Sequence, residues 1–299
     1  MKENYTNEEL LAVIKQRFEE NDKMLAAERK LAQELHEVNE KLLASEELKS
    51  NFLSNIRNEI NNPLSAILEL TKSIAEGGLS EEAVKKYASL VYLEAFDLDF
   101  QLRNIFLSAE IEAGEAPLSV AKVNVVSLIN GLIQSFSKKA AKKGVEIEFV
   151  PSETAISFPS DNEKLHLILA NVLANAIQFN KEGGKVSVNV KEEGEQCIIS
   201  IEDTGIGIPK EEFDRIYDRF YQVESGSTKT YMGHGLGLSI TKALLDIINA
   251  TISLESEVGK GSVFTITLNP LVDESGLGDT FSEEGNEFLF DQDEDDMLF

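Results

Sequence analysis

Cysteine is almost absent from this sequence: Cys197 is the single one in 299 residues, which excludes an internal disulfide. It lies in the apolar run CIISIED and is predicted to be a small core residue. The N-terminus, MKENYTNEELL, lacks the apolar segment of a signal peptide. No run reaches 18 apolar residues, because Asn171 and Asn175 interrupt the longest candidate, LHLILANVLANAIQF. From these absences we expect a cytoplasmic location without membrane insertion.

Positive charge is also scarce. The 28 Lys and Arg residues are outnumbered by 53 Asp and Glu residues, which gives a formal net charge of −25. This charge argues against nucleic acid and anionic membrane as partners, because both would repel the chain. It does not argue against a nucleotide that arrives with magnesium and is held by local groups. The length allows roughly two domains, since single hydrophobic cores seldom grow beyond about 250 residues.

Residues 7–50 contain no glycine or proline, and their apolar residues alternate at spacings of three and four. This spacing is typical of a coiled-coil seam, although the register slips between the first four residues and the last four. We therefore predict a coiled-coil signalling helix over residues 1–50. Its seam residues are Leu11, Ile14, Phe18, Leu25, Leu31, Leu35, Val38 and Leu42.

Residues 51–113 carry the most regular periodicity, with one apolar stripe on each side of Gly77 and Gly78. Three-four alternation on both sides predicts a helical hairpin. Two helices cannot enclose two such stripes, so two copies of the hairpin should form a four-helix bundle in a homodimer. The first stripe is Leu53, Ile56, Ile60, Pro63, Ile67, Leu70 and Ile74. The second is Val84, Ala88, Val91, Ala95, Leu98, Leu102, Ile105 and Ala109.

Residues 120–270 switch to a mixed pattern that predicts an α/β sandwich, so the fold class is α+β. Strand-like runs (VEIEF, KVSVNV, CIISIED, TISLES and SVFTITL) alternate with helical segments such as 125–143, 161–178 and 239–248. The remaining segment, 271–299, is acidic, with eleven Asp or Glu and no Lys or Arg between 273 and 299. It is predicted to be disordered, either as a solvated end or as a docking or self-inhibiting segment that uses its phenylalanines.

Residues 52–68, FLSNIRNEINNPLSAIL, resemble the phosphoacceptor helix of sensor histidine kinases. In that family a histidine stands where this sequence has Asn58. Because a carboxamide nitrogen is not a nucleophile, the resemblance implies a helix that cannot accept phosphate there. Glu59 and Asn62 match the E-x-x-N of the family, where an amide at the second position helps to orient the water that dephosphorylates a partner. Asn62 could equally be an ordinary residue before Pro63.

Four blocks in residues 161–264 resemble the ATP-binding domain that histidine kinases share with Hsp90, MutL and gyrase B. In the first, DNEKLHLILANVLANAIQFN, Asn171 and Asn175 lie one turn apart on a helix, and the resemblance implies that they hold Mg²⁺ through amide oxygens. In the second, DTGIGIP, the resemblance implies that Asp203 accepts a hydrogen bond from adenine. Gly205 and Gly207 would let the backbone approach the base.

The third block, FDRIYDRFYQ, contains Arg219, which matches a family position that reaches the phosphates, and its neighbour Tyr221. The fourth, GHGLGLS, leads into a helix whose free amides and dipole suit a phosphate. Its glycines are Gly233, Gly235 and Gly237, and GKGSVF completes the set as a turn between two strands. Two residues depart from the family, Gln178 for a common Lys and Met232 for a common Gly. Losing that cation would weaken ATP binding without abolishing it.

The other histidines are poor substitutes for the acceptor: His36 lies in the coiled coil, His166 at a variable position of the first block and His234 among the lid glycines. The resemblance therefore predicts a dimeric two-component protein that binds Mg-ATP but cannot autophosphorylate at Asn58. It would be a pseudokinase or a phosphatase that regulates a response regulator. Two alternatives stay open: a non-enzymatic ATP-sensing scaffold that regulates another kinase, and an active kinase carrying an engineered His-to-Asn substitution. A Hsp90- or MutL-like ATPase is disfavoured, because neither is expected to carry this hairpin.

Overall fold

The computed structural model describes residues 7–151, 155–222 and 235–271. For parts of the first helix, including residues 44–56, 58 and 59, it describes the backbone alone. The chain divides into two units, Met1–Asn55 and Ile56–Phe299. Apart from its first residue, the predicted acidic tail lies outside the described residues. Among the described helices, none combines the length and apolar character that crossing a bilayer requires.

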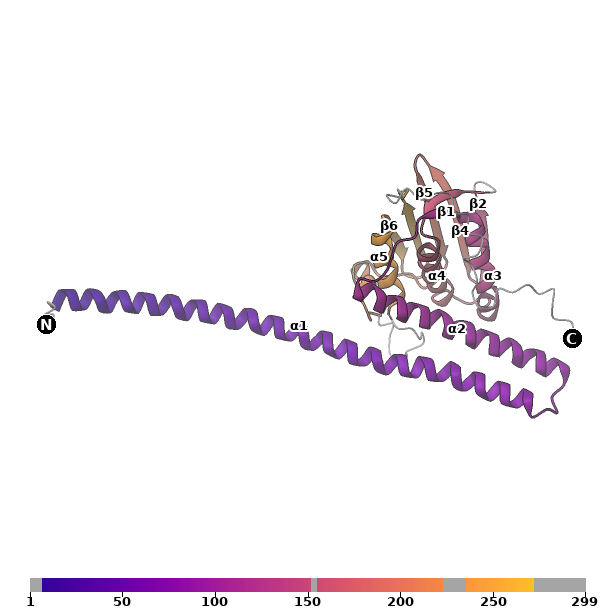
Figure 1. The fold of residues 1–299 in the computed structure, drawn as a ribbon, viewed down its shortest axis with the longest axis horizontal. Helices are drawn as coiled ribbons and strands as arrows, with labels where there is room; N and C mark the ends of the chain where they lie inside the picture. Colours follow the sequence, from indigo (N-terminus) through magenta and orange to yellow (C-terminus); the bar gives the residue numbers. More distant parts are fainter. Residues whose placement is uncertain (1–6, 152–154, 223–234, 272–299) are drawn as a thin grey trace. The chain divides into compact units, whose positions relative to one another are not determined.

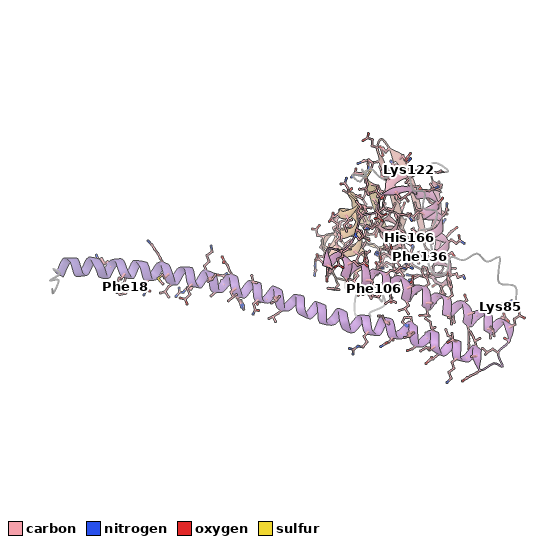
Figure 2. The ribbon with its side chains drawn as sticks, viewed as in Figure 1. Phe18, Lys85, Phe106, Lys122, Phe136 and His166 are labelled. Atoms are coloured by element: carbon pink, nitrogen blue, oxygen red, sulfur yellow. The ribbon has the colours of Figure 1, made fainter. Side chains whose placement is uncertain are left out.

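The first helix, α1 (Asn7–Ala75), continues without a break through residue 50 (Figure 1). In the N-terminal unit, the predicted seam residues whose side chains are described are all between 44 and 69% exposed: Phe18, Leu25, Leu31, Leu35, Val38 and Leu42. Phe18 is labelled in Figure 2. A single helix has nothing against which to bury such a seam, so the coiled coil stays a prediction that requires a second helix.

The second unit begins with the predicted helical hairpin. The C-terminal part of α1 turns at Gly77 and Gly78, whose φ angles of 76° and 81° suit glycine, and α2 (Glu81–Ala113) runs back alongside it (Figure 1). Ser80 caps α2 by accepting a hydrogen bond from the Ala83 backbone N–H at 3.2 Å. The helix ends at Gly114 in the left-handed conformation. The hairpin follows from these signals, whereas the four-helix bundle stays a prediction.

The predicted α+β fold class is confirmed, because helices and sheets follow the hairpin in the same chain. The main sheet has the order β2-β4-β5-β7-β6, in which β2 and β4 are parallel and the other neighbours are antiparallel. The strands are β2 (Glu146–Pro151), β4 (Lys185–Glu193), β5 (Gln196–Asp203), β6 (Ala250–Glu257) and β7 (Gly261–Leu268). A small antiparallel sheet joins β1 (Ala121–Asn124) to β3 (Ser157–Ser160). The sequence patterns had not indicated that small sheet.

Three helices lie against one face of the main sheet (Figure 1): α3 (Val125–Lys143), α4 (Asn162–Gln178) and α5 (Gly237–Ile247). Every second side chain of the central strands points toward them. On β5, for example, Cys197, Ile199 and Ile201 are at most 2% exposed. The core prediction for Cys197 is therefore confirmed, and burial raises the pKa of its thiol to about 12. Two short 3₁₀ helices, η1 (Lys210–Glu212) and η2 (Arg215–Tyr217), follow the second block.

Helix α2 also packs on this domain, through a face that the two-stripe pattern did not identify. The rings of Phe96 and Phe100 meet Phe136 of α3 edge-on, at centroid distances of 5.1 and 5.8 Å. An ion pair between Asp97 and Lys139, 2.6 Å long, flanks the cluster. Phe136 is fully buried on α3. Phe106 lies on α2, as Phe96 and Phe100 do, but it is 63% exposed; Figure 2 labels Phe106 and Phe136. Helix α2 therefore has apolar residues on more than one face.

Candidate nucleotide-binding site

The second block forms the loop that follows strand β5. Asp203 is the last residue of that strand and is 8% exposed. Its carboxylate oxygen Oδ1 accepts a hydrogen bond from the Gly205 backbone N–H at 2.8 Å. Burial raises the pKa of Asp203, while backbone hydrogen bonds from Gly205 and Ser262 oppose the shift and the charge of Glu202 adds to it. The result is a buried acceptor at the end of a strand, suited to an N–H donor on a ligand.

The two predicted glycines of this loop are required by contacts within the protein. A Cβ at Gly205 would lie 2.3 Å from the backbone oxygen of Phe179, at the end of α4. A Cβ at Gly207, where φ is 68°, would lie 2.1 Å from the backbone oxygen of Glu257, at the end of β6. Only glycine fits at either position, because real Cβ atoms do not approach so closely. The loop is thus held between α4 and the β6–β7 turn.

The two predicted amide ligands lie on α4 in different surroundings. Asn171 is 2% exposed, and its Nδ2 donates to Oδ1 of Asn104 on α2 at 2.9 Å. Its own Oδ1 faces the start of α5, where a Cβ at Gly237 would lie 3.2 Å from it. Asn175, one turn further on, is half-buried. Amide oxygens are suitable ligands for Mg²⁺, and the glycine leaves room beside one of them, so these residues fit that ion.

The third and fourth blocks meet at the start of α5. The Phe220 backbone N–H donates to the Gly235 oxygen at 2.9 Å, and both residues have positive φ angles, 67° and 66°. Gly233, the first glycine of the fourth block, lies outside the described residues. The helix begins at Gly237 rather than at the predicted residue 239, so the last glycine of the block belongs to its first turn. Among the described residues, no side chain caps the first turn of this helix, so its backbone N–H groups are suited to bind a phosphate.

The two predicted site residues of the third block, Arg219 and Tyr221, each contact a carboxylate. Arg219 pairs with Glu112 of α2. The Tyr221 hydroxyl donates to Glu212 at 2.5 Å, and the guanidinium of Arg215 lies 4.1 Å above the tyrosine ring. Arg219 and Asn171 therefore both bind residues of α2, Arg219 through an ion pair and Asn171 through a hydrogen bond. Sequence reasoning missed Asn104 and Glu112, because nothing in the pattern of α2 marks which residues meet the nucleotide domain.

The predicted acceptor-helix residues all lie on α1. The side chains of Asn58 and Glu59 are outside the described part, and Asn62 is exposed. Two of the three histidines are described. His36 lies 3.4 Å from Glu40 on α1. The pKa of His166 on α4 is lowered to about 4 by burial and by the nearby charge of Arg103 on α2, so this ring is neutral at pH 7.

Comparisons with known proteins find a family and relatives that are similar to this chain. The family described as "Histidine kinase-, DNA gyrase B-, and HSP90-like ATPase" matches residues 160–271. The circadian input-output histidine kinase CikA of Synechococcus elongatus is 30% identical over 228 residues, which cover 75% of this chain and 30% of that protein. The aerobic respiration control sensor protein ArcB of Escherichia coli is 31% identical over 243 residues, covering 79% of this chain and 30% of that protein. The chain therefore spans less than a third of the length of either relative.

A similar solved structure is the crystal structure of full-length ShkA in complex with AMPPNP. It aligns with a TM-score of 0.53 at 25% identity and covers 74% of this chain and 46% of that chain. The structural alignment covers 74% of this chain and therefore includes more than residues 160–271, the part that the family model matches.

Proposed function

Because this chain belongs to the sensor histidine kinase family, we propose that it is a two-component signalling protein that binds Mg-ATP and is not phosphorylated at Asn58. The observation that carries the nucleotide part is the meeting of all four sequence blocks. Gly205 contacts the end of α4, Gly237 lies beside Asn171, and Gly235 contacts Phe220. These contacts bring together the base acceptor Asp203, the amide oxygens and the start of α5.

The chemistry of each group suits one part of the nucleotide. The Asp203 carboxylate accepts from the amino group of adenine, and the first turn of α5 binds phosphate oxygens through backbone N–H groups. Asn171 and Asn175 hold Mg²⁺, which neutralises part of the triphosphate charge when it is bound. This metal pairing supports binding to a chain whose net charge is −25.

The absence of a nucleophile at position 58 carries the second part of the proposal. Asn58 has no lone pair on nitrogen that can attack the γ-phosphate, since that pair is delocalised into the carbonyl. We infer that His166 does not replace it, because this ring is half-buried on α4 near the charge of Arg103 on α2. The chain is therefore a pseudokinase at the usual position.

A dephosphorylating role remains open to such a chain. Asn62 is exposed on α1 and can both donate and accept hydrogen bonds. With Glu59 one turn away, its amide would hold a water in line with the aspartyl phosphate of a response regulator receiver domain. The water oxygen then bonds to phosphorus as the bond to the aspartate oxygen breaks, and inorganic phosphate leaves. The histidine is not needed in this reaction.

A second candidate is a non-enzymatic ATP-sensing scaffold, favoured by the contacts of α2. Two residues assigned to the nucleotide, Asn171 and Arg219, are bonded to Asn104 and Glu112 of that helix. A nucleotide that binds Asn171 and Arg219 would change their contacts with α2. A kinase or receiver bound at the hairpin would then respond to the nucleotide.

Incubation with γ-labelled ATP tests the proposal that Asn58 is not phosphorylated. The parent chain should incorporate no label, whereas Asn58→His should become labelled. Label on the parent chain would overturn the assignment. The dephosphorylating role is tested with a panel of receiver domains phosphorylated by acetyl phosphate. Loss of dephosphorylation in Asn62→Ala supports the phosphatase, while activity indifferent to this change in every receiver supports the scaffold.

A further inference from the structure

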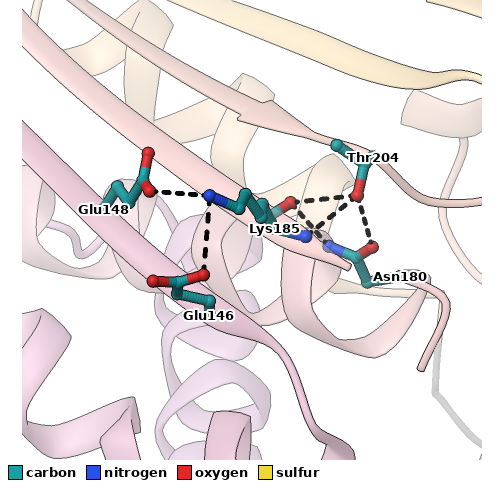
Figure 3. Close-up of polar contacts among 5 residues, drawn as sticks. All are labelled: Glu146, Glu148, Asn180, Lys185 and Thr204. Atoms are coloured by element: carbon teal, nitrogen blue, oxygen red, sulfur yellow. Dashed lines mark hydrogen bonds and ion pairs between the residues drawn. The ribbon is translucent and has the colours of Figure 1, made fainter. Parts of the chain in front are cut away.

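The loop that carries Asp203 is held on the α4 side by a buried asparagine that ends the first block. Asn180 is 1% exposed, and its side chain makes three hydrogen bonds. Its Oδ1 accepts from the Lys181 backbone N–H at 3.0 Å and from the Thr204 hydroxyl at 3.2 Å. Its Nδ2 donates to the backbone oxygen of Lys185 at 2.9 Å (Figure 3). The amide therefore joins the end of α4, the start of β4 and the residue that follows Asp203.

Thr204 is fixed at its backbone as well as at its side chain. Its N–H donates to the Lys185 oxygen at 3.1 Å, and its hydroxyl accepts from the Lys185 N–H at 2.9 Å. Figure 3 shows the contacts of the Thr204 hydroxyl with Lys185 next to the Asn180 amide. The Lys185 ammonium is in turn held by Glu148 at 2.9 Å and Glu146 at 3.5 Å on β2. Because Thr204 is bonded to Asp203 through a planar peptide, this network sets the direction of the Asp203 backbone.

The site for the Asn180 amide is shaped for it. A Cβ at Gly184 would lie 2.1 Å from Asn180 Oδ1, so only glycine leaves space there. The other polar atom of the side chain is satisfied by a backbone oxygen, as a buried amide requires. Such an arrangement can orient a neighbouring group, because each of its members has one available geometry.

A serine holds the same loop from the opposite side. The Ser256 hydroxyl accepts from the Ile208 backbone N–H at 2.8 Å and donates to the Gly261 oxygen at 2.9 Å. The Ser262 hydroxyl lies 3.0 Å from the Ser256 hydroxyl and donates to it, because the Ser256 proton is used in the bond to Gly261. The backbone N–H of Ser262 is one of the donors to the Asp203 carboxylate. The serine therefore ties the far end of the loop to the strand that supports the carboxylate.

We propose that Asn180 is a positioning residue for base recognition: with Ser256, it holds the loop so that the Asp203 carboxylate meets the amino group of adenine. This inference rests on the proposed function, since it assumes that the site binds ATP. Asn180 itself does not touch the base. Its effect is confined to the interaction that Asp203 makes, which separates it from a residue that merely stabilises the fold.

The test compares ATP with ITP, whose base carries an oxygen in place of the amino group. Binding is measured by calorimetry with Mg²⁺ present, for the parent chain, Asn180→Ala and Ser256→Ala. Asn189→Ala, on the exposed face of β4, is the matched control. The parent should prefer ATP, and Asn180→Ala should lose about tenfold in ATP affinity with little change for ITP, the size of one charge-assisted hydrogen bond. Ser256→Ala should act in the same direction, and Asn189→Ala should keep the parent ratio.

The outcomes separate the two claims. Binding of neither nucleotide to the parent chain overturns the proposed function. A parent that prefers ATP, together with an Asn180→Ala variant of unchanged ATP-to-ITP ratio, overturns the positioning role alone. Where Asn180→Ala does not fold, Asn180→Asp and Thr204→Val decide by the same ratio. Asn180→Asp removes the bond to the Lys185 oxygen, and Thr204→Val removes the bonds of the hydroxyl to Asn180 and to the Lys185 N–H. Both conserve side-chain volume, and an unchanged ratio in both overturns the role.

Discussion

The side-chain nitrogen of Asn171 lies 2.9 Å from the side-chain oxygen of Asn104, and this hydrogen bond links α4 to α2 across 67 residues of sequence. Both residues are less than 8% exposed. The bond leaves the Asn171 oxygen directed toward the start of α5, where Mg²⁺ and phosphate are proposed to bind. A residue of the hairpin thus orients Asn171, a proposed Mg²⁺ ligand of the nucleotide domain.

Removing one partner of this pair should be costly. We expect Asn104→Leu to lower the free energy of unfolding by about 1–3 kcal/mol, because it leaves the buried Asn171 N–H groups without an acceptor. Urea denaturation of Asn104→Leu, Asn171→Leu and the double variant measures the coupling. The double variant should be less destabilised than the sum of the single variants. Strictly additive costs would show that the two amides do not interact.

Asp203→Asn should raise the stability of the protein and lower its affinity for ATP. Burial raises the pKa of Asp203, so at neutral pH the folded chain carries a charge that the unfolded chain solvates better. Asparagine has nearly the same shape without the charge, and we expect a gain on the order of 1 kcal/mol, seen as a Tm higher by a few degrees.

The stability gain should depend on pH in a defined direction. As pH falls through the raised pKa of Asp203, the parent carboxyl takes up a proton and the penalty disappears, so the Tm values of parent and Asp203→Asn converge. Glu255→Gln, an exposed position of strand β6, is the control. A Tm difference that widens toward acid would contradict the assignment of the penalty to Asp203.

Base preference should be lost in acid. The proposed hydrogen bond from adenine to Asp203 is stronger when the carboxylate is ionised, and the pKa of Asp203 is raised, so this loss begins at a higher pH than for an ordinary aspartate. We expect the ratio of ATP to ITP affinity to fall as pH falls, in fluorescence competition titrations. The ratio cancels the titration of the triphosphate, which both nucleotides share. An Asp203→Asn variant should show a ratio that does not change with pH.

The homodimer proposed from the sequence can be tested at exposed apolar positions of the hairpin. Leu68 on α1 is 61% exposed and Phe106 on α2 is 63% exposed, which makes both available to a second copy. We expect Leu68→Glu with Phe106→Glu to raise the dimer dissociation constant at least a hundredfold, because a buried interface would have to accept two unpaired charges. Sedimentation measures the change.

The control for the dimer is Lys191→Glu, an exposed position of strand β4. It should leave the sedimentation coefficient unchanged. A parent chain that sediments as a monomer at all concentrations would contradict the dimer, and an unchanged dimer in the double variant would place the interface elsewhere on the hairpin.

Local patterns predicted the elements well where each carries its own signal. The helix predicted over 125–143 has those bounds in α3, because its apolar period and its Gly144 stop are both local. Strand β5 was recognisable from the alternation that buries Cys197, Ile199 and Ile201. Strands β1 and β3 were missed because four residues are too few for a period, and they exist as strands only through pairing with each other.

The site divides in the same way. Asn171, Asn175, Asp203 and the loop glycines were predicted from the resemblance of short sequence blocks to a known family, because backbone approach and metal binding restrict which residues fit. Asn104, Asn180 and Ser256 were not, since an ordinary polar residue carries no mark of the group that it will meet. Their roles come from contacts such as that between Asn180 and Thr204, 24 residues apart, and between Ser256 and Ile208, 48 residues apart.

The linear chain alone specified which chemistry is present: amide oxygens, one strand-end carboxylate, glycine-rich turns and an amide at position 58. Folding decided how those groups are held, through the pairing of α2 with α4 and the clamping of the Asp203 loop between α4 and the β6–β7 turn. The reason is physical. Backbone preferences act over a few residues, whereas burial requires every polar group to find a partner, wherever along the chain that partner lies.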